Sequence, residues 1–190
     1  LIADAMLWKA RSAGPMIAIQ NSGGVRKDVP AGDITIGGVY ELMPFGNTLV
    51  VLDLSGRELR ESLEEAIDYQ IAAGNKEPYL YVAGMSFRLD REASSGKRVN
   101  DIKIVDRDSS ALLLDESRTY RIVVNNYLAE GGDGMKILKR ATGYRNDTGF
   151  SDAEVFMDYL KQKGTISNPT EKRISTHPLM PRVWEMKKAA

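Results

Sequence analysis

Cysteine is absent from this 190-residue chain, and histidine occurs once, as His177. The missing cysteines exclude disulfides, thiol nucleophiles and cysteine-held metals, but they leave the cellular compartment open. A hydrolytic metal centre usually draws on imidazole as well as carboxylate ligands, and this chain offers one imidazole at most. The composition therefore argues against a hydrolytic metal centre built from this chain.

Long apolar runs and an excess of charge of one sign are also missing. No run approaches the roughly 18 apolar residues that mark a membrane span, so we expect none. Basic and acidic residues number 26 each, which gives no support for a nucleic-acid polymer or an anionic membrane as the main partner. A small charged ligand needs only a local cluster. Because the chain begins without Met, inside an apparent helix and without a signal peptide, we expect it to be a piece of a longer protein.

The hydrophobic pattern predicts one mixed α/β or α+β domain with a sizeable core. We expect the folded domain to span residues 1–175 and residues 176–190 to form a loosely held tail that includes His177. Helical spacing and capping signals predict helices over residues 1–13, 37–43, 56–71 and 152–163. Short β-branched or alternating runs predict strands over residues 16–20, 34–36, 48–55, 79–83, 85–89, 99–105 and 120–124.

A glycine-rich turn follows the first predicted strand, with the sequence Asn21-Ser22-Gly23-Gly24-Val25-Arg26. Two adjacent glycines let the backbone turn sharply and let another group approach it closely. Arg26 adds a planar, permanently charged guanidinium that suits a phosphate or a carboxylate. The alternative is a structural bend followed by solvated charges.

Two further breaks, at residues 44–47 and 125–134, each place an aromatic residue beside glycine and asparagine. Phe45 and Tyr127 could sandwich a flat ring, since base–aromatic stacking contributes roughly 1–3 kcal/mol per base. The asparagines and Asp133 could bind ring edges or sugar hydroxyls, and Arg26 could bind a phosphate. In the alternative, both aromatic residues belong to the core and the glycines only turn the chain. Composition and spacing leave both interpretations open.

Taken together, the motifs closely resemble the C-terminal domain of the 5′-nucleotidase family, which includes UDP-sugar hydrolases and 2′,3′-cyclic phosphodiesterases. The resemblance rests on residues 21–26, 31–35, 44–50, 126–134 and 147–150, which follow the order and spacing of the family. It spans about residues 1–175 and implies a layered α/β/β/α fold.

The resemblance also implies a role for each matched residue. Phe45 and Tyr127 would stack on the base, and Asp133 would contact the ribose hydroxyls. The motif that contains Gly23 and Gly24 would contact the nucleoside and phosphate side through Asn21 and Arg26, and Asn47 and Gly84 would lie beside the base. Two features depart from the family pattern. Phenylalanine is frequent where Tyr127 stands, and a further phosphate-side arginine of the family would precede Leu1.

In this family the catalytic residues and two divalent metal ions belong to an N-terminal metallophosphoesterase domain. The resemblance thus implies that this chain carries substrate-binding residues but no catalytic residue, metal ligand or cofactor. The expected partners are that domain and a nucleotide or nucleoside such as AMP or adenosine, a UDP-sugar or a cyclic nucleotide. The expected location is periplasmic, cell-surface or secreted. The alternative is a non-catalytic ligand-binding or surface module that retains the fold.

Overall fold

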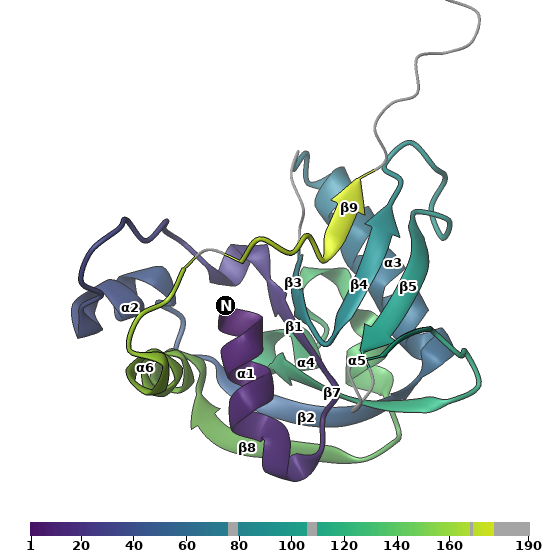
Figure 1. Cartoon of the computed structure of the whole chain (residues 1–190). Helices are drawn as coiled ribbons and strands as arrows, with labels where there is room; N and C mark the ends of the chain where they lie inside the picture. Colours follow the sequence, from purple (N-terminus) through teal and green to yellow (C-terminus); the bar gives the residue numbers. More distant parts are fainter. Residues whose placement is uncertain (76–79, 106–109, 168, 177–190) are drawn as a thin grey trace, which may run out of the picture.

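Two β-sheets and the helices packed on them form the fold (Figure 1). The computed structural model describes residues 1–75, 80–105, 110–167 and 169–176. The larger sheet has five strands in the order β3 (Leu80–Ala83), β1 (Ile17–Asn21), β7 (Thr119–Asn125), β2 (Thr48–Ser55) and β8 (Arg145–Ser151). The smaller sheet has four, in the order β6 (Ala111–Leu113), β5 (Val99–Val105), β4 (Met85–Leu89) and β9 (Ile174–Thr176).

Strand direction in the larger sheet decides which loops meet. β1 runs parallel to β7, with Ile19 opposite Val124, whereas β2 runs antiparallel to β7, with Leu49 opposite Asn125. The carboxyl ends of β1 and β7 and the amino end of β2 therefore lie at the same edge of the sheet. The chain segments that follow Asn21 and Asn125 and precede Thr48 are brought together there.

Alternation along the central strands divides the apolar residues between two cores. On one face, α1 (Ile2–Ala10), α2 (Ile36–Leu42) and α6 (Asp152–Lys163) pack against side chains such as Ala18 and Val51. On the other face, Ile19 and Leu52 share a core with α3 (Gly56–Ala72) and the inner face of the smaller sheet. No helix in the described parts of the chain is both long and apolar enough to cross a membrane.

The α+β class is confirmed, and most predicted elements lie within a few residues of their expected bounds. The first helix ends earlier than expected, because a short 3₁₀ turn, η1 (Arg11–Ala13), follows α1. The strand predicted at residues 34–36 is wrong. Thr35 Oγ1 accepts a hydrogen bond of 3.0 Å from Gly38 N, which makes Thr35 the N-cap of α2 and Ile36 its first residue.

Three strands had no sequence signal strong enough to predict them. β8 carries the polar sequence Arg-Asn-Asp-Thr-Gly-Phe-Ser, without the apolar alternation that marks a half-buried strand. β6 and β9 have three residues each, and β9 pairs with β4 through Ile174 opposite Phe87. The predicted tail, apart from Thr176 at the end of β9, lies outside the described residues, and so does His177.

Candidate functional site

The three polar breaks of the sequence meet at one edge of the larger sheet. The first becomes η2 (Ser22–Gly24), directly after β1. The second is the turn that contains Phe45 and Asn47, directly before β2. The third becomes α4 (Asn126–Ala129) and η3 (Gly132–Gly134), after β7. Since these segments lie at adjacent strand ends, the fold brings together eight of the nine predicted site residues.

A chain of buried amides joins the first and third breaks. Asn125 is fully buried, and its Oδ1 accepts a hydrogen bond of 2.9 Å from Leu128 N, which caps α4. Its Nδ2 donates to Gln20 Oε1 at 3.1 Å and to Asn21 Oδ1 at 2.9 Å. Gln20 Nε2 also donates to Asn21 Oδ1, at 3.3 Å. Buried amides are costly unless they are hydrogen-bonded, so this arrangement fixes Asn21.

Asp133 lies at the surface end of this chain of hydrogen bonds. Its Oδ2 accepts 2.9 Å from Asn21 Nδ2, and its Oδ1 accepts 3.0 Å from the Tyr127 hydroxyl. The Asp133 backbone has a φ of 48°, in the left-handed region that few non-glycine residues adopt. Each carboxylate oxygen keeps a lone pair for a further donor. The carboxylate is thereby held in place and can still accept hydrogen bonds from a ligand.

Tyr127 and Phe45 are exposed aromatic residues, with 44% and 58% of their surface accessible, so neither belongs to the core. A Cβ atom at Gly132 would overlap the ring of Tyr127, so the glycine makes room for it. Partial burial is the main cause that raises the pKa of the Tyr127 phenol, and the Asp133 carboxylate raises it further, although the Asp133 N–H lowers it. The hydroxyl therefore stays protonated at neutral pH and donates to Asp133.

The turn that carries Phe45 is attached to its neighbours through Asn47 and Thr48. Asn47 O accepts a hydrogen bond of 2.9 Å from Asp152 N, at the start of α6. Thr48 N donates 3.0 Å to Asn126 Oδ1 in α4. Burial raises the pKa of Asp152 to about 6, although the hydrogen bonds from Ala153 N and Asn47 lower it. Asp152 thus helps to fix the second break to α6, while Thr48 holds it beside the third.

The two glycines of the first break differ in how much space surrounds them. A Cβ at Gly24 would overlap Gln20 Nε2 and lie 2.9 Å from Asn21 Oδ1, whereas a Cβ at Gly23 would lie 3.6 Å from Asn21 Nδ2. Gly24 therefore gives space to the buried amides, and Gly23 faces the Asn21–Asp133 contact. Arg26 is exposed, and its Nη1 donates to Gly23 O at 3.4 Å. Within the described residues it has no acidic partner.

Gly84 is the one predicted site residue that the fold does not bring to this edge. It follows β3, which runs antiparallel to β1 with Ala18 opposite Ala83 and Asn21 opposite Leu80. Gly84 therefore lies at the start of β1, at the far end from Asn21. Its φ is 72°, and a Cβ there would overlap Met16 O. Gly84 therefore allows a close approach of the chain's own backbone.

Sequence reasoning did not single out Gln20 or Asp152, which support the site. It counted Asn125 among the asparagines that could bind ring edges or sugar hydroxyls, whereas Asn125 is fully buried beneath the site. Asn125 stands where an apolar strand passes into Asn-Tyr-Leu, a pattern that could have indicated an N-cap. Gln20 and Asp152 gave no comparable signal. In the described parts of the chain, no three acidic or histidine side chains gather closely enough to hold a metal ion.

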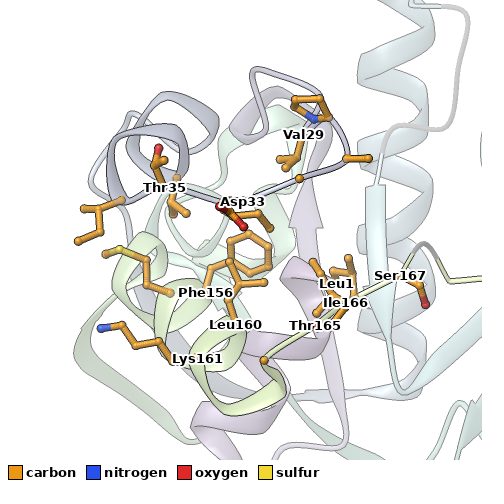
Figure 2. Close-up of a pocket in the computed structure, with 18 residues that line it drawn as sticks. Leu1, Val29, Asp33, Thr35, Phe156, Leu160, Lys161, Thr165, Ile166 and Ser167 are labelled. Atoms are coloured by element: carbon orange, nitrogen blue, oxygen red, sulfur yellow. The ribbon is translucent and has the colours of Figure 1, made fainter.

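A cavity lies elsewhere in the described part of the chain. It measures about 880 Å³ and lies between the loop at residues 29–35, α2, α6 and the segment at residues 164–167. Figure 2 shows apolar side chains such as Phe156, Leu160 and Ile166 around it, with Asp33 and Lys161 among them. None of the nine predicted site residues lines this cavity. The predicted site is instead an open surface at the sheet edge.

The structure thus defines a mixed α+β domain with polar, aromatic-bearing loops at one edge of its larger sheet. The chain belongs to the 5′-nucleotidase C-terminal domain family, whose family model matches residues 1–140. It is 39% identical over 169 residues to the trifunctional nucleotide phosphoesterase protein YfkN of Bacillus subtilis (strain 168), a match that covers 88% of this chain and 11% of that protein. It is 36% identical over 166 residues to a probable 5′-nucleotidase of Treponema pallidum (strain Nichols), a match that covers 84% of this chain and 28% of that protein.

A solved structure shows the same fold. The crystal structure of a 5′-nucleotidase precursor from Thermus thermophilus matches with a TM-score of 0.86 and 47% sequence identity. The match covers 92% of this chain and 34% of that one. The chain therefore spans about a tenth to a third of the length of these relatives. The expected fold family is confirmed, and most of the relatives' length has no counterpart in this chain.

Proposed function

We propose that this domain binds the base and ribose of a nucleotide for a metal-dependent phosphohydrolase, 5′-nucleotidase-like in type. The observation that carries the proposal is the meeting of Phe45, Tyr127 and Asp133 at one sheet edge. Two exposed aromatic side chains can stack on a base, and a fixed carboxylate can accept hydrogen bonds from ribose hydroxyls. The names of the relatives, a nucleotide phosphoesterase and a probable 5′-nucleotidase, support the same class of ligand.

The rest of the proposed site follows from what each break offers. Arg26 presents an exposed guanidinium next to Gly23, where it can meet a phosphate oxygen. The turn carrying Asn47 is fixed to α6, so Phe45 is presented on an anchored segment. A site held in this way loses little conformational entropy when the ligand binds, which favours affinity.

We further propose a division of labour between this chain and an N-terminal metallophosphoesterase domain of an exported protein, either periplasmic, cell-surface or secreted. In that domain two divalent metals would activate water and polarise the phosphate, while this domain positions the nucleoside. The isolated chain is then expected to hydrolyse nothing. Release of phosphate from AMP by the purified chain with added divalent metal, above a buffer blank, would contradict this expectation.

Isothermal titration calorimetry with adenosine and AMP tests the proposed binding site. The chain is expected to bind both weakly, and Phe45→Ala is expected to remove the binding. Tyr144→Ala is the matched control, because Tyr144 is also exposed, at 42%, but lies beside Asp53, toward the opposite end of β2. Unchanged affinity in Phe45→Ala, or equal losses in both variants, would refute the stacking site.

A further inference from the structure

We propose that Asn125 is a positioning residue that sets the hydrogen-bonding direction of Asn21 and Asp133, and that it thereby makes the site select ribonucleosides over 2′-deoxyribonucleosides. The inference rests on the proposed function and adds a substrate preference and a residue that determines it. Asn125 is fully buried and lies beneath the ligand-facing residues, so it acts through them.

The direction of the hydrogen bonds follows from one backbone group. Leu128 N can only donate, so the Asn125 atom 2.9 Å from it must be the oxygen. The Asn125 nitrogen then faces Gln20 Oε1 at 3.1 Å and Asn21 Oδ1 at 2.9 Å, and both of its hydrogens are used. The amide orientation of Asn125 is thus determined by the first turn of α4.

The amide orientation of Asn125 in turn determines that of Asn21. Because its oxygen accepts from Asn125 and Gln20, its nitrogen must point outward, where it donates 2.9 Å to Asp133 Oδ2. Tyr127 donates to the other oxygen, Oδ1, at 3.0 Å. Asp133 is therefore fixed by one donor on each oxygen, and its free lone pairs face outward as a pair of acceptors. Two acceptors on one carboxylate match the neighbouring 2′ and 3′ hydroxyls of a ribose. A 2′-deoxyribose lacks the first of these hydroxyls.

Asn125→Asp should reverse the direction of the hydrogen bonds in this chain of amides, although aspartate has almost the same shape as asparagine. The carboxylate still accepts from Leu128 N, and aspartate is as good an N-cap as asparagine. Its second oxygen, however, faces Asn21 Oδ1 and Gln20 Oε1, and acceptors at hydrogen-bond distance repel one another. Turning the Asn21 amide relieves this contact but points its oxygen at Asp133 Oδ2. Asp133 Oδ2 then loses its donor, and Tyr127 alone no longer fixes both acceptors.

The test compares affinities for adenosine and 2′-deoxyadenosine by calorimetry. The wild-type chain is expected to prefer adenosine, and Asn125→Asp is expected to reduce the adenosine to 2′-deoxyadenosine affinity ratio about tenfold, the change expected when a charge-assisted hydrogen bond is lost. Asn146→Asp, on the exposed surface of β8, controls for the added charge and should keep the wild-type ratio. A folded Asn125→Asp variant with the wild-type ratio would overturn the positioning role alone.

Asn125→Ser covers the case in which the aspartate variant fails to fold. Serine also caps a helix, but its hydroxyl is too short to reach Asn21, so the affinity ratio should fall in the same way. In the wild-type chain, NMR should show the Asn21 side-chain amide protons near Asp133 and in slow exchange with water, and their absence would also overturn the inference. A wild-type chain that binds no adenosine would instead overturn the proposed function and this inference with it.

Discussion

Asn21 Nδ2 lies 2.9 Å from Asp133 Oδ2 although 112 residues separate the two in the chain. The contact exists because β1 and β7 are parallel neighbours whose carboxyl ends meet at one edge of the sheet. It joins the glycine-rich turn after β1 to the glycine-rich segment after β7. The carboxylate proposed to bind ribose is therefore held by a residue of a different loop, and its position depends on the pairing of the central strands.

Tyr127→Phe should weaken nucleoside binding without removing it. The ring that we propose to stack on the base remains, but Asp133 Oδ1 loses the hydroxyl that donates to it at 3.0 Å. A single hydrogen bond contributes about 0.5–1.5 kcal/mol net, so affinity should fall roughly twofold to tenfold. Calorimetric titration with adenosine measures the change.

Tyr127→Ala provides the comparison, because it removes the ring as well. Its loss should be larger, since base–aromatic stacking contributes roughly 1–3 kcal/mol per base. If the phenylalanine variant bound as poorly as the alanine variant, the hydroxyl would be the main contribution of Tyr127 and the stacking role would be wrong. If both bound like the wild type, Tyr127 would lie outside the site.

Gly24→Ala should destabilise the protein, whereas Gly23→Ala should be tolerated. The new methyl group at Gly24 would overlap Gln20 Nε2 and press on Asn21 Oδ1, both within the buried amide chain. Overpacking of this kind costs typically about 1–3 kcal/mol. At Gly23 the nearest atom, Asn21 Nδ2, is 3.6 Å away, which is an ordinary contact. Urea unfolding of the two variants checks the difference, and equal stability of both would contradict it.

The sequence predicted the central strands and the long helices well, since their signals are local. β2 and α3 carry strong apolar periodicity, and both were found within one residue of the expected bounds. The three polar breaks also stood out, because glycine and asparagine interrupt the apolar pattern in each of them, and the second and third carry an aromatic residue as well. Their assignment to one site came from the family resemblance, and the strand order supplies the physical reason.

The features of the fold and the site that could not be predicted from the sequence depend on contacts between residues far apart in the chain. β8 is held by backbone pairing with β2, so its polar side chains show no strand pattern. Gln20 and Asn125 look like ordinary polar residues at strand ends until the fold places them within 3.1 Å of each other. At Gly84, the glycine indicates that some group lies close to the backbone, but only the fold shows that this group is Met16 O.

Gly84→Ala should reduce stability and leave nucleoside affinity per folded molecule unchanged. The residue has a φ of 72°, which costs an L-residue roughly 1–2 kcal/mol, and its new methyl would also overlap Met16 O. Gly96→Ala is the matched control, because Gly96 has a φ of 79° with no atom within 4 Å of the new methyl. Gly84→Ala should therefore unfold at a lower urea concentration than Gly96→Ala. Reduced nucleoside affinity at unchanged stability would instead support the prediction that Gly84 lies beside the base.

Asp152 should make the protein less stable as pH rises from about 4 to about 6. Burial is the largest influence on this carboxyl and raises its pKa from 3.8 to about 6. Between these two values the folded protein holds a proton that the unfolded chain has released, so unfolding releases a proton there. The contribution to stability is therefore greatest below pH 4, falls through this window and stays low above it, by an amount on the order of 2–3 kcal/mol.

Asp152→Asn removes this titration, and the comparison cancels the groups that the two proteins share. The difference in unfolding free energy, variant minus wild type, should rise between pH 4 and pH 7 by the amount that the wild type loses. Glu154→Gln, which removes an exposed acid two residues further along α6, should show no such rise. Urea unfolding at several pH values measures all three proteins. A flat difference for Asp152→Asn would mean that the carboxyl is ionised throughout the range, with Asn47 and Ala153 N stabilising the anion enough to offset its burial.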